Sequence, residues 1–145
     1  MVQGYGYGSE KESGVKGFID DIMDLTDANE AFRRVVYTGR HLQMVLMRLM
    51  AGEAIGLEAH AGHDQFFHII DGVGVVTIDG VGARVSKAAV VLVPAGARHN
   101  IVNAGDGPLA LYTLYAPPEH RDGLVHDSLD DAARAPAPFD GRTSE

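Results

Sequence analysis

Residues 52–72 read GEAIGLEAHAGHDQFFHIIDG, and residues 94–103 read PAGARHNIVN. The first stretch places Glu58, His60 and Gln65 between two glycines, in the order G-x5-E-x-H-x4-Q-x6-G. The second places His99 in the order P-x-G-x2-H-x3-N. Side chains with nitrogen and oxygen lone pairs therefore recur at fixed spacings along the sequence. The fold of the chain decides whether they come together in space.

Short β-rich runs separated by Gly, Pro and Asp turns surround these two stretches. Asp-Gly pairs at 71–72 and 79–80 supply residues that tolerate positive φ in hairpin turns. No helical pattern separates the runs, which excludes a parallel α/β sheet. The sequence thus predicts an all-β sandwich or barrel, with strands near 33–38, 43–50, 56–60, 65–71, 74–78, 83–86, 89–93, 99–103 and 109–115.

The domain organisation follows from length and composition. At 145 residues the chain is one domain, long enough to bury a core. Residues 1–16, rich in Gly, Ser and charge, are predicted to be disordered or loosely attached. Residues 17–127 form the barrel domain, which begins with a short helical turn within 20–30. Residues 128–145 are predicted to form a helical turn and then a disordered tail.

Composition disfavours several classes of protein. The formal net charge of −8, without clustered Lys and Arg, argues against a nucleic-acid surface. The chain has no cysteine, which excludes disulfides and thiolate-bound zinc. The N-terminus is not typical of a signal peptide, and no apolar run approaches the ~20 residues of a membrane span. We therefore expect a cytoplasmic protein with neither nucleic acid nor membrane as a partner.

The two spacings resemble the signature motifs of the cupin superfamily, with Ala88 in place of the glycine that opens the second motif. The resemblance to single-domain bacterial cupins, of the mannose-6-phosphate-isomerase-like group, extends over residues 60–74, 93–100 and 115–120. It implies a double-stranded β-helix, a jelly-roll-like barrel with short flanking helical turns. It also implies that Glu58, His60, Gln65 and His99 hold one divalent transition metal ion, which could be Fe, Mn, Ni or Zn.

The ligand set departs from the family pattern in one respect. Glu58 stands where the family has a histidine, and Gln65 stands where it has a glutamate, so the number of anionic ligands stays at one. Alternate residues of a strand face the same side, so Glu58 and His60 are predicted to project together. We expect Gln65 to approach from the adjacent strand and His99 from the opposite sheet. Three protein ligands plus waters are the alternative, because a neutral amide is a weaker donor than a carboxylate.

Other residues are candidates for contact with a small organic ligand. His63 lies in the loop between the two predicted ligand-bearing strands, where a solvated polar loop is the alternative. Phe67 shares the parity of Gln65 and is predicted to line the interior, whereas His68 is predicted to face outward. His120 is predicted at the barrel entrance. Any proton transfer would fall to His63, Glu119 or His120, and no catalytic residue is assigned.

The run from 43 to 50 is apolar on both faces except at Arg48. A strand buried on both sides lies between a core and a second cover, and we expect that cover to be another copy of the chain in a homodimer.

Three functions fit the sequence. The first is a mononuclear metalloenzyme of the dioxygenase or isomerase type that acts on a small organic molecule inside the barrel. The second is a non-catalytic module that binds a small molecule or a metal. The third is a sugar-phosphate isomerase or epimerase, which would need convergent Arg or Lys side chains around the phosphate.

Overall fold

A computed structural model describes residues 16–145, so nearly all of the N-terminal segment predicted to be disordered lies outside the described residues. The described chain is mostly strand and has two short helices, α1 (Ile22–Ala28) and α2 (Leu129–Arg134). The strands are β1 (Arg33–Thr38), β2 (Gln43–Leu49), β3 (Asp64–Asp71), β4 (Val73–Ile78), β5 (Val81–Ser86), β6 (Val90–Val93), β7 (His99–Asn103), β8 (Leu109–Ala116) and β9 (Val125–His126).

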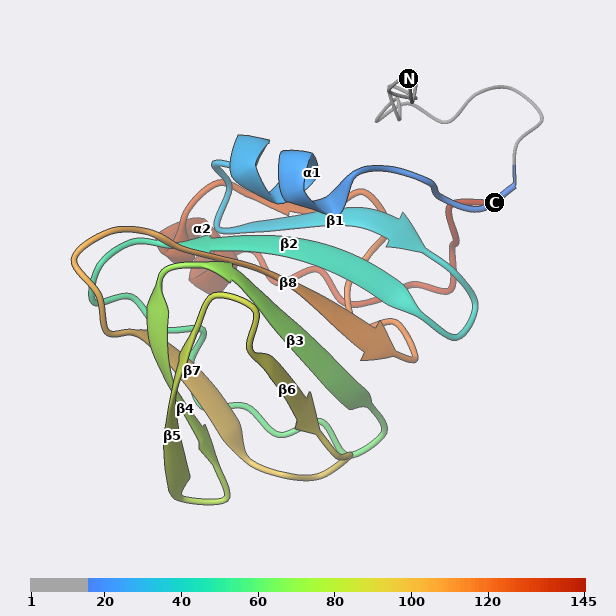
Figure 1. Ribbon diagram of the computed structural model, residues 1–145. Coiled ribbons are helices and arrows are strands. Elements are labelled where there is room, and N and C mark those ends of the chain that lie inside the picture. The colour runs from blue at the N-terminus through green and yellow to red at the C-terminus, as the bar shows by residue number, and fades with distance from the viewer. Residues whose placement is uncertain (1–15) are drawn as a thin grey trace.

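The strands form two antiparallel sheets that face each other (Figure 1). One sheet has the order β6-β3-β8-β2-β1-β9, and the other has the order β5-β4-β7. Neighbours in the sheets are distant in sequence, as in β3 beside β8, which is the mark of a jelly-roll arrangement. The predicted all-β double-stranded β-helix is confirmed.

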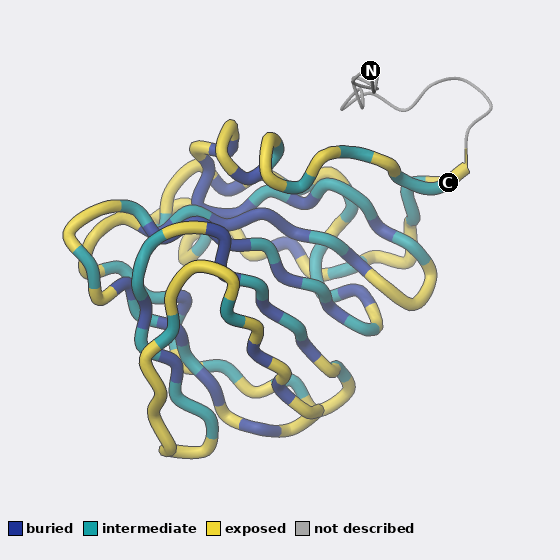
Figure 2. The backbone as a smooth tube through the Cα atoms, in the orientation of Figure 1, coloured by how far each residue is buried: buried dark blue, intermediate teal, exposed yellow. Residues whose placement is uncertain are grey.

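The core fills the space between the sheets (Figure 2). Alternate residues of β2, β3 and β8 are fully buried, including Val45, Phe67 and Leu111. Directly paired residues of neighbouring strands place their side chains on one face, so these strands build continuous inward-facing rows. One row runs from Gln43 through Tyr115 to Gln65, and it carries polar groups into the interior.

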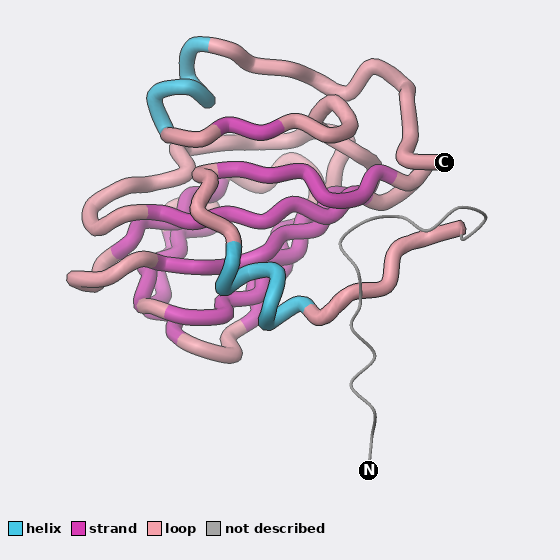
Figure 3. Tube along the Cα trace, turned by 90° about the horizontal axis from the view of Figure 1, so that it is seen from above, coloured by secondary structure: helices cyan, strands magenta, loops and turns pink. Residues whose placement is uncertain are grey.

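The two helices lie outside the strands (Figure 3). Helix α1 begins after Asp21, whose carboxylate accepts a hydrogen bond of 2.9 Å from the backbone N–H of Asp24. It packs against β2 and β8 and covers part of the outer face of the larger sheet. Helix α2 begins after Ser128, whose hydroxyl accepts from the backbone N–H of Asp131.

The residues after α2 differ from the disordered tail that composition predicts, because they bond back to the barrel. The N–H of Phe139 donates to the carbonyl of Glu119 at 3.0 Å, and the N–H of Ser144 donates to the carbonyl of Thr38 at 2.8 Å. Ala137 is buried. These backbone hydrogen bonds join residues that are far apart in the sequence, and the Pro- and Ala-rich composition of this segment does not predict them.

The segment predicted as a strand at 56–60 is another difference. It is extended but forms only isolated bridges, in which Ala54 pairs with Val102 and Glu58 with His99. It therefore runs along β7 as an irregular extension of the smaller sheet. Gly56, with φ of +98°, interrupts the regular pairing.

Gly72, at the corner between β3 and β4, combines a φ of +96° with a close approach of the chain. A Cβ at this position would lie 2.6 Å from the carbonyl oxygen of Pro108. Gly52 also has a positive φ, +80°, but a Cβ there would meet nothing within 4 Å.

We expect Gly72→Ala to lower the free energy of unfolding by about 1–3 kcal/mol more than Gly52→Ala does. Both variants carry the strain of positive φ, and Gly72→Ala adds the clash with backbone. Urea unfolding followed by circular dichroism measures both. Equal losses in the two variants would contradict the argument that close approach requires this glycine.

Candidate metal centre

The two motifs are joined by a pair of backbone hydrogen bonds between Glu58 and His99. The N–H of Glu58 donates to the carbonyl of His99 at 2.9 Å, and the N–H of His99 donates to the carbonyl of Glu58 at 2.8 Å. Directly opposed residues of an antiparallel pair project their side chains on one side. Residue 60 follows two positions later, so Glu58, His60 and His99 meet on the same face.

These three side chains form a compact cluster. One ligand atom from each of Glu58, His60 and His99 lies within 4.8 Å of the others. The Oε2 of Glu58 lies 3.2 Å from Nε2 of His60 and 4.0 Å from Nε2 of His99. All three come from the side of the smaller sheet, so the expectation that His99 arrives from the sheet opposite Glu58 and His60 is wrong. The cause is the pairing of residues 54–58 with β7.

His99 shows that the cluster suits a cation. Its Nδ1 lies 3.2 Å from the carbonyl oxygen of Ala97, and a carbonyl only accepts, so Nδ1 carries the proton. The other nitrogen, Nε2, is left with a lone pair, is buried, and has no hydrogen-bond partner among the described residues. It faces the Glu58 carboxylate, which is also an acceptor. Two acceptors that face each other in a buried site are satisfied by a shared positive ion.

His60 is held by two carboxylates. Its Nε2 faces Glu58, and its Nδ1 lies 3.6 Å from Oε1 of Glu119. The hydrogen bond with Glu58 raises the pKa of His60; burial lowers it, and the negative charge of Glu119 adds to the rise. A carboxylate behind the outer nitrogen of a ligating histidine orients the ring and raises its basicity.

Gln65 enters the interior from β3, in the larger sheet, and not from a strand adjacent to Glu58 and His60. Its Nε2 donates to the hydroxyl of Thr113 at 3.0 Å. Its Oε1 is buried and has no hydrogen-bond partner in the described part of the chain. The amide is thus turned so that its oxygen, the atom able to bind a metal, is the free one.

The residues predicted to contact a ligand lie in different surroundings. His63 lies at the mouth, with its Nδ1 2.6 Å from the carbonyl of Pro117 and its Nε2 3.0 Å from Oε2 of Glu119. Phe67 is fully buried, and its ring centroid lies 5.9 Å from that of His99. The Nε2 of His120 lies 3.4 Å from the hydroxyl of Tyr115. The structure therefore puts Phe67 beside the cluster, and it separates His120 from His60 by the ring of Tyr115.

Two further interior residues are Tyr115 and Arg33, of which sequence reasoning missed Arg33. Tyr115 is fully buried against His60, and burial raises its pKa well above the usual range. Arg33 is 7% exposed on the inner face of β1. Its position two residues before Val35, in an alternating strand, was the signal that could have placed it inside. His68 is turned outward, where its Nδ1 lies 3.1 Å from the hydroxyl of Tyr112.

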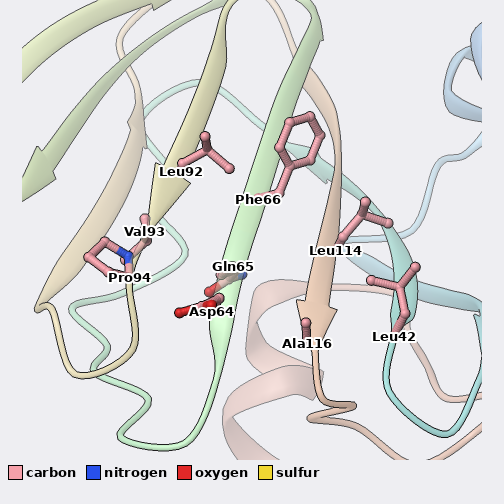
Figure 4. Close-up of a pocket in the computed structure, with 9 residues that line it drawn as sticks. All are labelled: Leu42, Asp64, Gln65, Phe66, Leu92, Val93, Pro94, Leu114 and Ala116. Atoms are coloured by element: carbon pink, nitrogen blue, oxygen red, sulfur yellow. The ribbon is translucent and has the colours of Figure 1, made fainter.

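A groove of about 420 Å³ lies on the outer face of the larger sheet, away from the cluster (Figure 4). Leu92 of β6, Phe66 of β3 and Leu114 of β8 project into it from three neighbouring strands. Its lining is almost wholly apolar and offers few polar groups, so the candidate functional site is the cluster and not this groove.

This architecture and cluster define a double-stranded β-helix protein with a candidate metal centre inside the barrel. No helix in residues 16–145 is long and apolar enough to cross a membrane. The Cupin domain family matches residues 45–115. The uncharacterized protein YrkC of Bacillus subtilis is 41% identical over 131 residues, which are 86% of this chain and 70% of that protein.

Solved structures of other proteins share this fold. The crystal structure of BH2720 from Bacillus halodurans has a TM-score of 0.81 and 41% identity, and the match covers 85% of this chain and 98% of that one. TT1209 from Thermus thermophilus has a TM-score of 0.61 and 25% identity over 68% of this chain and 96% of that one. The chain belongs to the cupin superfamily. Its place in the mannose-6-phosphate-isomerase-like group stays a prediction.

His120 gives the site a pH dependence. Burial, with the positive charge of Arg33, lowers the pKa of His120 to about 3. Below about pH 6.5, His120 therefore binds a proton in the unfolded chain and stays neutral in the folded chain. The stability that neutral His120 contributes is present above pH 6.5 and is lost as the pH falls toward 3.

We expect the free energy of unfolding of the metal-free protein to fall between pH 7 and pH 5 by about 2 kcal/mol more in the wild type than in His120→Gln. Urea titrations in a chelator at the two pH values measure it. The variant lacks the titrating group and keeps the pH dependence of the other histidines. The same slope in both proteins would exclude His120 as a source.

Proposed function

We propose that the protein binds one divalent transition metal ion through Glu58, His60 and His99, with the amide oxygen of Gln65 as a fourth ligand. We propose further that it acts on a small organic molecule in the barrel, as a mononuclear metalloenzyme of the dioxygenase or isomerase type. The supporting observation is the lone pair of His99 Nε2, which is buried, has no hydrogen-bond partner within residues 16–145, and is directed at a carboxylate. Two imidazoles with one carboxylate match the donor set of non-haem iron oxygenases, and Mn, Ni and Zn accept the same donors.

A divalent ion bound there would supply a Lewis acid that polarises a carbonyl or enolate oxygen of the ligand. The chain's own residues supply the proton chemistry. His63 and Glu119 share a contact of 3.0 Å, while the other nitrogen of His63 faces a carbonyl. Both contacts are hydrogen bonds only when the pair holds one proton more than a neutral imidazole and a carboxylate. His63 and Glu119 are therefore our candidates for proton transfer at the mouth of the barrel.

The alternatives make different demands on the site. A binding module needs the same cluster but no proton donor, and the apolar lining suits it as well. A sugar-phosphate isomerase needs several cations around a phosphate. Arg84, Lys87 and Arg98 are exposed, and Arg48 lies on the outer face of β2. Their placement disfavours the isomerase of sugar phosphates. The cytoplasmic location stays a prediction from composition.

We expect His60→Ala and His99→Ala each to lose bound metal, with the β-sheet circular dichroism preserved, because each removes one of few ligands. Metal content per chain, measured by inductively coupled plasma mass spectrometry after dialysis, checks this. His68→Ala is the matched control, since it removes an imidazole from the outer face of β3. Unchanged metal content in both His60→Ala and His99→Ala would refute the ligand assignment.

The reaction type is tested on the metal-loaded protein. Oxygen uptake with enolizable diketones or catechols that requires Fe(II) supports the oxygenase. Turnover of the same compounds without oxygen supports an isomerase, and turnover of sugar phosphates supports the third function. Binding without turnover of any of these leaves the non-catalytic module.

The outer face of the larger sheet suits contact with a second copy of the chain. Leu92, Phe66, Leu114 and Met44 form one directly paired row across four strands. Leu92 is 70% exposed. The chain carries a formal charge of −8, so contact between two copies is least opposed where the facing surfaces are uncharged, and this row is uncharged. We propose a homodimer built on this face by two-fold symmetry, which makes one patch serve both partners.

We expect the wild type to have twice the 15.5 kDa mass of the chain in light scattering after gel filtration, and Leu92→Asp to have the mass of one chain. A carboxylate in the row would be buried against its symmetry mate at a cost that dissociates the pair. Val81→Asp, at an equally exposed site on β5, should remain dimeric. A monomeric wild type, or a dimeric Leu92→Asp, would exclude this interface.

A further inference from the structure

Arg33 is a buried positive charge that the proposed metal site does not use. It pairs with Met47 across β1 and β2, and so leaves the sheet on the face that carries Val45 and Leu49 into the core. Among the described residues, no carboxylate lies within ion-pair distance of its guanidinium. Its Nε is buried and has no hydrogen-bond partner there. Glu58 of the cluster and the neighbouring Glu119 make their ion pairs with histidines.

An unpaired buried charge makes the free energy of folding less favourable. Desolvation of an ion costs several kcal/mol unless a counter-charge or hydrogen bonds compensate it. The ring of Phe32 lies 5.5 Å from the guanidinium carbon, which compensates a part of that cost. A methionine of similar length would pack in such a core without the penalty. The charge is therefore better explained by a ligand than by packing.

The guanidinium is also held in a set orientation. Nη1 of Arg33 lies 3.2 Å from Nδ1 of His126. Nε2 of His126 lies 2.7 Å from the carbonyl oxygen of Ala135, which only accepts. Nε2 thus carries the proton of His126, and Nδ1 accepts from Arg33. His126 is 3% exposed and acts as a neutral positioning residue that orients the fork of N–H groups.

Arg33 lies on the same inner face of the larger sheet as Tyr115, the residue packed against His60. The rings of His60, Tyr115 and His120 are in successive contact, with centroids 5.9 Å and 5.2 Å apart. The row of Arg33, Met47 and Leu111 lies two inward-facing rows from the row of Gln43, Tyr115 and Gln65. Arg33 therefore lies on the same inner face of the larger sheet as the middle ring of this stack.

We propose that Arg33 is the anion-binding residue of this barrel and that the ligand is a small organic carboxylate. One guanidinium matches the single charge of a carboxylate and presents parallel N–H groups to its two oxygens. A phosphate dianion would call for further cations, which the interior does not offer among the described residues. The inference extends the proposed function, because it names the chemical class of the molecule that the metal site would act on.

The test is calorimetric titration of the protein with acetate, pyruvate and succinate, and with their uncharged amides, up to about 10 mM, since a weak ligand binds in the millimolar range. We expect the wild type to bind at least one carboxylate and not its amide. Arg33→Gln should weaken that binding by about 10- to 100-fold, the worth of a charge-assisted hydrogen bond. Arg48→Gln, which removes the same charge from the outer face, should bind as the wild type does.

Metal content is measured in every protein, which separates this inference from the proposed function. Loss of carboxylate binding in Arg33→Gln at unchanged metal content supports the role of Arg33. If the wild type takes up no metal, the same titrations on the metal-free protein still test it. Should Arg33→Gln not fold, Arg33→Lys and the amide comparison decide. The proposal is overturned if the wild type binds none of the carboxylates, binds acid and amide alike, or if a folded Arg33 variant binds with the affinity of the wild type.

Discussion

The reciprocal backbone pair between Glu58 and His99 is the constraint on which the site depends. These residues are 41 positions apart, and two hydrogen bonds of 2.8 and 2.9 Å place them opposite each other. Because opposed residues project on one side, the pairing alone directs a carboxylate and an imidazole to one point, and His60 follows by alternation. The turn at 94–96 adds to this, since the N–H of Gly96 donates to the carbonyl of His60. The conformation of each motif is thus set by the other.

Much of the fold was predictable because its signals are local. Period-two alternation and Asp-Gly turns predict the strands of β3, β4 and β8 within a few residues, and the motif spacing predicts that residues 58, 60 and 99 converge. The pairing of the strands could not be predicted from the sequence. The segment at 54–58 joins β7 and leaves Gln65 in the other sheet, and nothing in the spacing separates this from the opposite arrangement. Sequence patterns report a strand's faces but not its neighbours.

The surroundings of Arg33, Glu119 and Asn103 could not be read from the sequence, for the same reason in each case. Arg33 is charged, and although its spacing from Val35 is compatible with an inward position, its pairing with Met47 is what shows that it turns inward. Glu119 follows two prolines beyond the last long strand, in a stretch whose path depends on contacts with Gln43 and with the tail. Asn103, the last residue of the second motif, bonds the carbonyls of Leu49 and Gly107 and so fastens the loop before β8. Each role is long-range, and a single sequence gives no direct sign of it.

The path of residues 135–145 has a practical consequence. Phe139 and Ala137 are bonded to residues 119 and 121, and the carbonyl of Ala135 holds His126. The closing stretch thus covers the segment that carries Glu119, His120 and His126, and it reaches the end of β1 through the bond between Ser144 and Thr38. Proteolytic removal of this stretch, or a purification tag fused to it, would therefore disturb the segment of Glu119 and His120 before it disturbs the core of the β-sandwich. Such a preparation could keep its β-sheet spectrum while the surroundings of the candidate metal centre are altered.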